Sequence, residues 1–332
     1  MSNRTLLEIR DLHAYIDSPR GVVRAVDGVT VALDKGEALG IVGESGSGKS
    51  VMARAVMGLM PARSACTGQV IFKGRDLLGL RRKDLEEIWG KQIAMVFQDP
   101  ARSLNPVVRV ERQLTEGMRH HLGISRSEAR TRALALLDEV GVPDPERRLR
   151  AYPHELSGGM RQRVMVAVAL AGEPDLLIAD EPTTALDVTI QRQVLDLLRR
   201  VQIERRMALM LISHDLHVVA RCTDRTAVMY AGRLGEIGAS QAVFEKPRHR
   251  YTHALLAATP TMVRKRHTPL TVIPGSLPSP VDPPEGCRFA PRCTAATAQC
   301  STGQPPMNRL ADDHSVACLH TVDMEEGELV GR

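Results

Sequence analysis

One short segment combines glycine, serine and lysine at a spacing that suits phosphate binding. It lies between an apolar run at 38–42 and a helical pattern at 49–59. Glycines let backbone N–H groups curl around phosphate oxygens, and the start of the helix adds positive potential. Lys49 would reach the terminal phosphates and Ser50 would bind Mg²⁺. The alternative is a tight strand–helix turn that binds nothing. The spacing matches G-x-x-x-x-G-K-[ST], in the residues Gly43, Glu44, Ser45, Gly46, Ser47, Gly48, Lys49 and Ser50.

Two carboxylates follow another apolar run, at 176–179. Asp180 is the candidate to hold Mg²⁺ through its water shell, and Glu181 is the candidate to activate an attacking water. Successive side chains of a strand point to opposite faces, so the two acids would have different tasks. Acids at strand ends are often only solvated, but the phosphate loop upstream favours the catalytic interpretation.

The segment LSGGMRQR precedes a further apolar helix, VMVAVALAG. Ser157 is a plausible N-cap, and the glycines after it leave free N–H groups at a helix start. This pattern predicts a second anion site. The alternative is an ordinary capped helix, because two phosphate sites in one monomer would be redundant.

The elements that must position these residues alternate between strand and helix. Strand patterns cover 5–42, and buried strands are expected at 174–180 and 207–215. Helices are expected at 125–141, where Ser125 and Glu128 form a capping-box pattern, and at 190–202. Alternating strands and helices predict an α/β fold with a mostly parallel sheet.

Length and composition exclude several classes of protein. The chain has 332 residues, 43% hydrophobic and 25% charged, which suits about two globular domains. It has no apolar run of 18 or more residues and no apolar stretch at its start, so we expect neither a membrane-spanning helix nor a secretory signal. The net charge is +5, but basic residues are spread along the chain and aromatic residues make up 3%. A nucleic-acid partner is therefore not expected.

Together these motifs resemble the ATP-binding cassette (ABC) ATPases, in which LSGGMRQR would be the signature that completes the nucleotide site of a partner subunit. Gln98, in VFQDP, matches the Q-loop glutamine, which senses the γ-phosphate and Mg²⁺. Asp187, in Ala185-Leu186-Asp187, matches the D-loop, and His214 matches the switch histidine. Tyr15 stands where the family places an aromatic that stacks on adenine. The signature residues implied to face a partner's ATP are Ser157, Gly158, Gly159 and Gln162.

The resemblance implies an ABC-type P-loop nucleotide-binding domain over about 1–250, with a RecA-like core, a β-subdomain and a helical subdomain inserted at about 100–165. Two such subunits would close head to tail on two ATP molecules. Lys49, His214, Mg²⁺ and the partner's signature serine would meet the charge at the γ-phosphate, and Glu181 would direct water. Ser50, Gln98 and Asp180 would form the Mg²⁺ site.

Within that family the chain is most similar to the ATP-hydrolysing subunits of dipeptide and oligopeptide importers. The discriminating segment is the tail at 251–332, with HRYTHALLAATP, PGSLPSP and GCRFAPRC. Nickel importers carry similar ATPases and are the alternative. The resemblance implies a second ATPase subunit, two membrane permease subunits and an extracytoplasmic peptide-binding protein. It also implies a peripheral location on the cytoplasmic face of the membrane.

Four of the six cysteines crowd the tail, at Cys287, Cys293, Cys300 and Cys318. Four thiolates suit a metal, and these long, uneven spacings fit a [4Fe–4S] cluster better than zinc, which usually uses close C-x2–4-C pairs. The resemblance to importer ATPases with such a tail cluster favours the same choice. Zinc and four unligated thiols are the alternatives. A cluster would staple a small Cys-rich C-terminal extension that cannot build its own core.

Two other ATPase classes fit less well. Cassette proteins of translation carry two cassettes in one chain, whereas this chain has one phosphate loop and one signature. Chromosome and DNA-repair ATPases need a long heptad insertion, and about 115 residues between Gly43 and Ser157 leave no room for it.

Overall fold

The computed structural model describes residues 4–99, 103–184, 187–259, 272–310 and 313–322. The chain divides into two compact units. Unit 1 consists of Met1–Arg4, Asp34–Ala38 and Gly79–Ile212, and unit 2 of Thr5–Leu33, Leu39–Leu78 and Ser213–Arg332. These units do not test the predicted division at residue 250, which stays a prediction.

Unit 1 contains three parallel strands: β6 (Ile93–Val96), β7 (Leu176–Asp180) and β8 (Ala208–Ser213). The middle strand, β7, pairs in parallel with β6 and with β8. Every residue of these strands is buried, as expected of a parallel sheet covered on both faces. The predicted parallel arrangement is therefore confirmed in unit 1.

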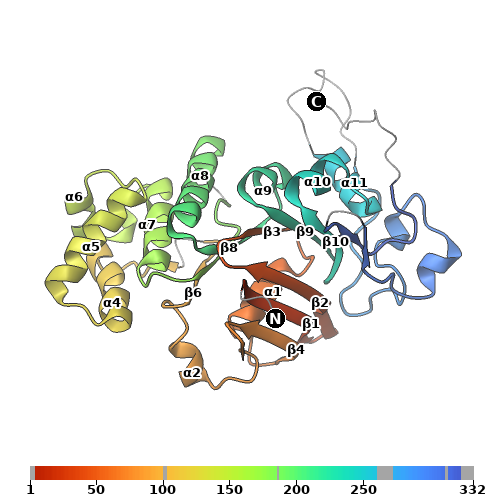
Figure 1. The fold of residues 1–332 in the computed structure, drawn as a ribbon, viewed down its shortest axis with the longest axis horizontal. Coiled ribbons are helices and arrows are strands. Elements are labelled where there is room, and N and C mark those ends of the chain that lie inside the picture. Colours follow the sequence, from red (N-terminus) through yellow and green to blue (C-terminus); the bar gives the residue numbers. More distant parts are fainter. Residues whose placement is uncertain (1–3, 100–102, 185–186, 260–271, 311–312, 323–332) are drawn as a thin grey trace. The chain divides into compact units, whose positions relative to one another are not determined.

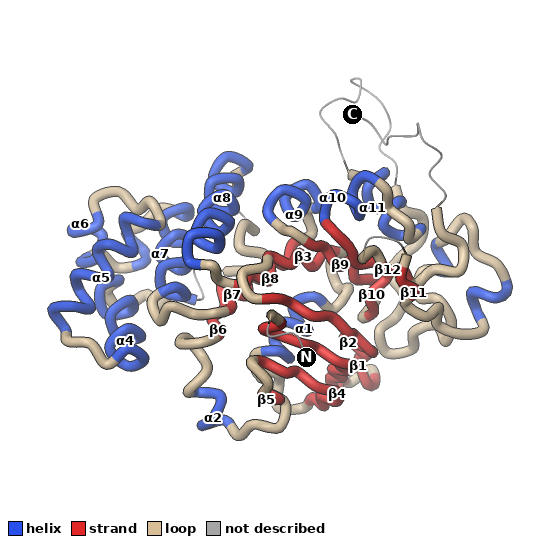
Figure 2. Tube along the Cα trace, viewed as in Figure 1, coloured by secondary structure: helices blue, strands red, loops and turns tan. Residues whose placement is uncertain are grey.

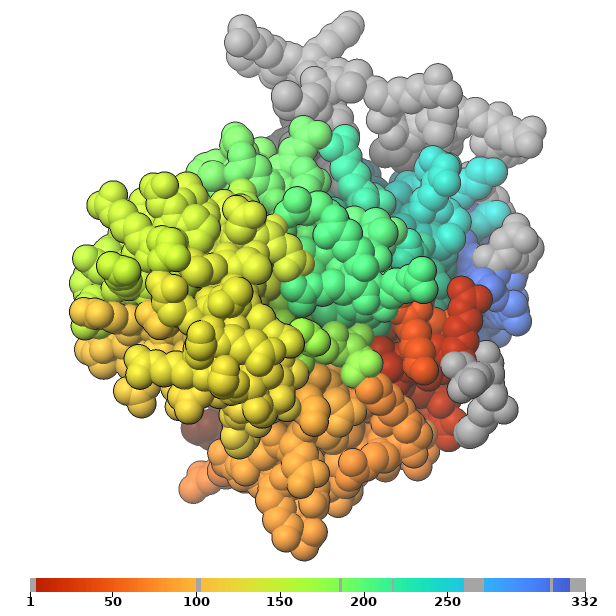
Figure 3. Space-filling model, turned by 60° about the vertical axis from the view of Figure 1, so that its left-hand side comes forward, coloured from red at the N-terminus to blue at the C-terminus, as the bar shows by residue number. Residues whose placement is uncertain are grey.

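Helices make up most of the rest of unit 1. Ser125 caps α5, as its sequence pattern predicts, because its hydroxyl accepts a hydrogen bond from the Glu128 amide at 3.2 Å. Figure 1 shows α4, α5, α6 and α7 packed as one group, and Figure 3 shows the surface of this group in yellow to yellow-green. The helices are α2 (Arg82–Glu86), α4 (Val110–Leu122), α5 (Arg126–Glu139), α6 (Pro145–Arg150), η1 (Pro153–Glu155), α7 (Gly158–Leu170) and α8 (Val188–Arg205).

Unit 2 contains an antiparallel sheet in the order β2-β1-β4-β5, in which the long strands lie side by side (Figure 2). Alternating apolar and polar residues build the two N-terminal strands, so one face of each is buried. The predicted strands within 5–42 are confirmed. The four strands are β1 (Thr5–Ser18), β2 (Gly21–Asp34), β4 (Ser64–Phe72) and β5 (Arg75–Asp76).

A second group of strands in unit 2 joins the tail to the rest of the unit. β3 (Ala38–Val42) pairs in parallel with β9 (Arg225–Tyr230), and β9 pairs antiparallel with β10 (Arg233–Ala239). The tail then adds two short antiparallel strands, β12 (Ser315–Val316) on β10 and β11 (Asn308–Arg309) on β12. The tail is therefore attached to unit 2 by backbone hydrogen bonds.

The helices of unit 2 are short. They are α1 (Lys49–Val56), α9 (Leu216–Cys222), α10 (Ser240–Glu245), α11 (Arg250–Ala258), η2 (Ala290–Arg292) and η3 (Ala298–Ser301). Among the helices that the structure describes in the whole chain, none is both long enough and apolar enough to cross a membrane.

Candidate functional site

The phosphate loop follows β3 and ends at α1, both in unit 2. Its backbone requires glycine at two positions. Gly43 and Gly48 have φ of 154° and 101°, and a Cβ at either position would lie 2.0 Å from a backbone oxygen, of Met229 and Ala25 respectively. L-residues avoid such conformations and no real Cβ approaches an oxygen so closely. The two glycines therefore let the loop pack tightly against the backbone of Ala25 and Met229.

The lysine of the loop is held inside it. Lys49 is 4% exposed, and its ammonium donates to the carbonyl oxygens of Gly43 at 2.7 Å and Glu44 at 2.9 Å. It also lies 3.3 Å from the hydroxyl of Ser47, a fully buried residue. A positive charge is thus centred in a loop of backbone N–H groups, which is an arrangement suited to phosphate oxygens.

Tyr15 belongs to a polar network in unit 2 that the sequence did not reveal. Its hydroxyl donates to Asp27 Oδ1 at 2.6 Å, and His13 Nδ1 lies 3.0 Å from the same oxygen. Arg233 contacts the other Asp27 oxygen at 2.9 Å, and Arg288 pairs with it too. Burial opposes ionisation of Asp27, but these hydrogen bonds and charges prevail and lower its pKa to about 2. The network fixes the Tyr15 hydroxyl and leaves its ring half-buried; stacking on adenine stays a prediction.

The carboxylates lie at the end of β7 in unit 1. Asp180 is 3% exposed, and Glu181 adopts a left-handed backbone with φ of 45°. Such a conformation is strained for a non-glycine residue and is typical of functional sites. The Glu181 side chain accepts hydrogen bonds from Gln98 Nε2 and from the Thr184 hydroxyl, both at 3.0 Å.

The structure thus brings together Gln98 and Glu181, which the sequence singled out separately. Thr184 was missed. It is the second of two adjacent threonines, and no sequence pattern marks it as a partner of the carboxylate. Together the amide and the hydroxyl fix one oxygen of Glu181 and so orient its carboxylate.

The signature residues begin helix α7 in unit 1. The Ser157 hydroxyl caps the helix by accepting from the Met160 amide at 3.3 Å, as the sequence predicts. Ser157 and Gly158 are exposed, so the start of the helix is accessible. A Cβ on Gly159 would lie 3.0 Å from Ile190 of α8, so this glycine permits close packing. Gln162 is 1% exposed.

Two further predicted residues lie at the ends of elements in the chain: Asp187 precedes a helix and His214 follows a strand. Asp187 caps α8, with its Oδ1 accepting from the Ile190 amide at 2.9 Å. Ala185 and Leu186 of the same motif lie outside the described residues. His214 directly follows β8 and is exposed.

The tail cysteines do not form a metal site in this structure. Burial, and to a smaller extent the nearby thiols of Cys300 and Cys318, raise the pKa of Cys287 and of Cys293. The four thiols therefore lie in one neighbourhood. Within the described ranges, however, no group of three or more His, Cys, Asp or Glu side chains is placed to hold a metal ion. The predicted metal-stapled, Cys-rich extension is not supported.

Comparisons with known families match both halves of the chain. Residues 26–184 match the ABC transporter family, and residues 236–300 match the family described as oligopeptide/dipeptide transporter, C-terminal region. The oligopeptide transport ATP-binding protein OppD of Bacillus subtilis is 48% identical, over 94% of this chain and 87% of that protein. The dipeptide transport ATP-binding protein DppD of Escherichia coli is 46% identical, over 96% and 97%.

Solved structures agree on the fold. The dimeric ATP-binding cassette MJ0796 with ADP and Pi has a TM-score of 0.63 at 26% identity, over 71% of this chain and 99% of that chain. CbiO1 of Clostridium perfringens, part of an ABC transporter complex, has a TM-score of 0.63 at 28% identity, over 73% and 91%. The fold and the phosphate loop therefore define a P-loop ATPase of the ABC class. Within that class, the chain belongs to the family of oligopeptide and dipeptide ABC-transporter ATP-binding proteins.

Proposed function

We propose that this chain is the ATP-hydrolysing subunit that powers import of dipeptides or oligopeptides through a membrane ABC transporter. The observation that carries the proposal is a phosphate loop with Lys49 at its centre, in a chain whose relatives match it almost end to end. The tail match at 236–300 favours peptides as the substrate class. The nickel alternative has less support, because the relatives named above are peptide transport proteins.

The residues present fit MgATP. Gly43 and Gly48 allow the tight turn of the loop, because a Cβ at either position would meet the backbone oxygen of Met229 or Ala25. A glycine-rich turn before a helix can present its N–H groups to phosphates. Lys49 would bind the terminal phosphates. Ser50, Gln98 and Asp180 would hold Mg²⁺, which neutralises charge on the phosphate oxygens.

Hydrolysis would depend on Glu181. Gln98 and Thr184 hold one of its oxygens, so the carboxylate is oriented before substrate arrives. It would position or deprotonate the attacking water, while Lys49 and His214 stabilise charge at the γ-phosphate. Asp187, in the D-loop motif Ala185-Leu186-Asp187, would also take part in hydrolysis.

A second ATPase subunit would complete each site. The exposed Ser157 and Gly158 at the start of α7 would contact ATP held by the partner's phosphate loop. The helices within 100–165 would contact two permease subunits at the cytoplasmic face of the membrane. An extracytoplasmic binding protein would deliver the peptide. Membership of the family supports these partners.

Besides MgATP, we propose a [4Fe–4S] cluster bound by four thiols of the tail: Cys287, Cys293, Cys300 and Cys318. Its support is the spacing and the common neighbourhood of the thiols; the side chains as placed do not offer a metal-holding group. The decisive measurement is iron, acid-labile sulfide and zinc in protein purified without oxygen. About four irons and four sulfides per chain would establish the cluster. The absence of both metal and sulfide would refute it.

Two variants test the proposed function in the assembled transporter. Glu181→Gln should retain ATP binding and abolish turnover, because the amide cannot accept a proton from water. Lys49→Ala should abolish peptide uptake. Normal ATPase activity in the first variant, or normal uptake in the second, would contradict the assigned roles.

A further inference from the structure

Two arginines of the tail reach back to residues near the candidate nucleotide site in unit 2. They are Arg288 and Arg292, in the loop 287–293 between two of the cysteines, which we call the cysteine loop. Both are buried, at 4% and 8% exposed. Buried arginines are rare unless paired, so their partners indicate what the loop is for.

Arg292 forms a two-pronged ion pair with the phosphate loop. Its Nη1 lies 2.6 Å from Glu44 Oε2 and its Nη2 lies 3.1 Å from Glu44 Oε1. The same guanidinium donates to the Tyr230 hydroxyl at 3.2 Å and to the Pro274 carbonyl at 2.9 Å. Such fork-shaped, charge-assisted contacts fix the carboxylate in position as well as neutralising it.

Glu44 is also held through its backbone. Its N–H donates to the Tyr251 hydroxyl at 2.8 Å. Tyr251 is fully buried, and burial raises the pKa of its phenol well above the usual value. The phenol therefore stays protonated, and both the side chain and the amide of the second residue of the phosphate loop are fixed by residues from 251–332.

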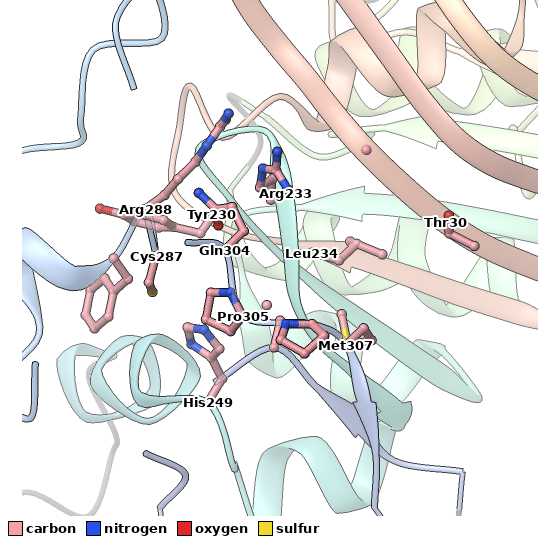
Figure 4. A pocket seen from close by; sticks show the side chains of 15 residues that line it. Thr30, Tyr230, Arg233, Leu234, His249, Cys287, Arg288, Gln304, Pro305 and Met307 are labelled. Atoms are coloured by element: carbon pink, nitrogen blue, oxygen red, sulfur yellow. The ribbon is translucent and has the colours of Figure 1, made fainter. Parts of the chain in front are cut away.

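Arg288 anchors the same cysteine loop to a second point. One of its terminal nitrogens pairs with Asp27 Oδ2 and the other donates to the Ala231 carbonyl. Figure 4 shows Arg288 and Arg233 from different segments beside a cavity of about 410 Å³ at this junction. The ion pair of Arg288 with Asp27 holds the cysteine loop in the position from which Arg292 contacts Glu44.

The charge of Glu44 explains why such a partner is needed. Its carboxylate belongs to the loop whose neighbouring residues would bind phosphate. An unpaired carboxylate there would repel the phosphates, because two negative charges at short range in a partly buried site interact strongly. Without a partner, the Glu44 side chain would also no longer hold the loop in place.

We propose that Arg292 is a positioning residue for ATP binding, which acts from the tail by neutralising Glu44 and fixing the start of the phosphate loop. The proposal rests on the proposed ATPase function. It assigns the tail a role in nucleotide affinity, in addition to its similarity to the tails of peptide transporter ATPases.

The test uses the full-length chain and a non-hydrolysable ATP analogue, with binding measured by calorimetry. The variants are Arg292→Met, Arg292→Lys, Glu44→Gln and the Glu44→Gln/Arg292→Met double variant. Arg309→Met is the matched control, because Arg309 is an exposed tail arginine paired with Asp313. Thermal melting without nucleotide verifies that each variant is folded.

Arg292→Met should weaken analogue binding about tenfold, equivalent to about 1.4 kcal/mol. Arg292→Lys should recover part of the loss, because it restores the charge and not the fork. The double variant should recover a similar part, because the unpaired carboxylate is gone although the fork is not restored. This rescue separates positioning from a merely structural role, which removal of a second partner would not repair. Arg309→Met should bind as the parent does.

Parent-like binding by Arg292→Met would overturn the inference. So would a double variant as weak as Arg292→Met, since the effect would then not run through Glu44. Failure of the ATPase proposal itself would differ: the parent would bind the analogue no better than Lys49→Ala.

Discussion

Replacing His249 should flatten the acid side of the protein's stability curve. His249 is 4% exposed and caps the start of helix α11, where its Nδ1 accepts from the Tyr251 amide at 3.0 Å. Burial lowers the pKa of His249 to about 4, although the nearby Glu236 carboxylate opposes the shift. The folded chain therefore holds a neutral imidazole over a pH range in which an unfolded chain would protonate it.

The sign and size follow from proton linkage. Between about pH 6.5 and pH 4 the unfolded chain binds the additional proton, so this histidine makes stability fall as the pH falls. The slope is about 1.4 kcal/mol per pH unit, which gives about 2 to 3 kcal/mol between pH 6.5 and pH 4.5. Below about pH 4 both states are protonated and the contribution stops changing.

The assay is urea unfolding at several pH values from 7 to 4.5. His249→Gln should lose about 2 to 3 kcal/mol less than the parent over this range, because the variant has no imidazole to protonate. His154→Gln, which removes an exposed histidine, is the matched control and should follow the parent. If His249→Gln and the parent lost the same stability on acidification, the neutral buried imidazole would be refuted.

The remaining predictions concern the site directly. Thr184→Val should lower ATP turnover several-fold with unchanged ATP affinity, because Glu181 loses one of two orienting hydrogen bonds; equal turnover would contradict that role. Gly48→Ala should weaken ATP binding about fivefold or more, since φ of 101° strains alanine by about 1–3 kcal/mol and its Cβ would push the loop away from Ala25; parent-like binding in calorimetry would contradict this. Asp27→Asn should destabilise the fold by about 3 kcal/mol by leaving the buried Arg288 without its carboxylate partner, and should remove the loss of stability between about pH 4 and pH 2. An unchanged melting temperature would refute it.

The sequence predicted what local patterns encode. Apolar runs marked the buried parallel strands, because a strand covered on both faces needs no polar alternation. Ser125 and Ser157 marked helix starts, because a hydroxyl can replace the missing helical acceptor. The phosphate loop was visible because its glycines and lysine are consecutive in the chain.

Long-range contacts account for what the sequence did not reveal. Glu44 and Arg292 are 248 residues apart, and no spacing rule links an acid in a glycine-rich loop to an arginine in a tail. The left-handed backbone of Glu181 is set by the strand end and its hydrogen bonds, and glutamate gives no local signal for it. Stacking of Tyr15 on adenine stays a prediction, and the contact of its hydroxyl with Asp27 was missed because it depends on how two strands align.

The tail shows how one sequence pattern can leave other important residues unnoticed. The spacing of the cysteines suggested a metal staple for a segment too small to fold alone. In the structure, attachment comes from the strand pairing of Ser315–Val316 and from the ion pairs of Arg288 and Arg292. Two buried arginines held by carboxylates fasten the cysteine loop to unit 2 whether or not the thiols bind metal. An iron and sulfide assay therefore tests the cofactor, whereas nucleotide binding by the Arg292 variants tests what the tail does for the phosphate loop.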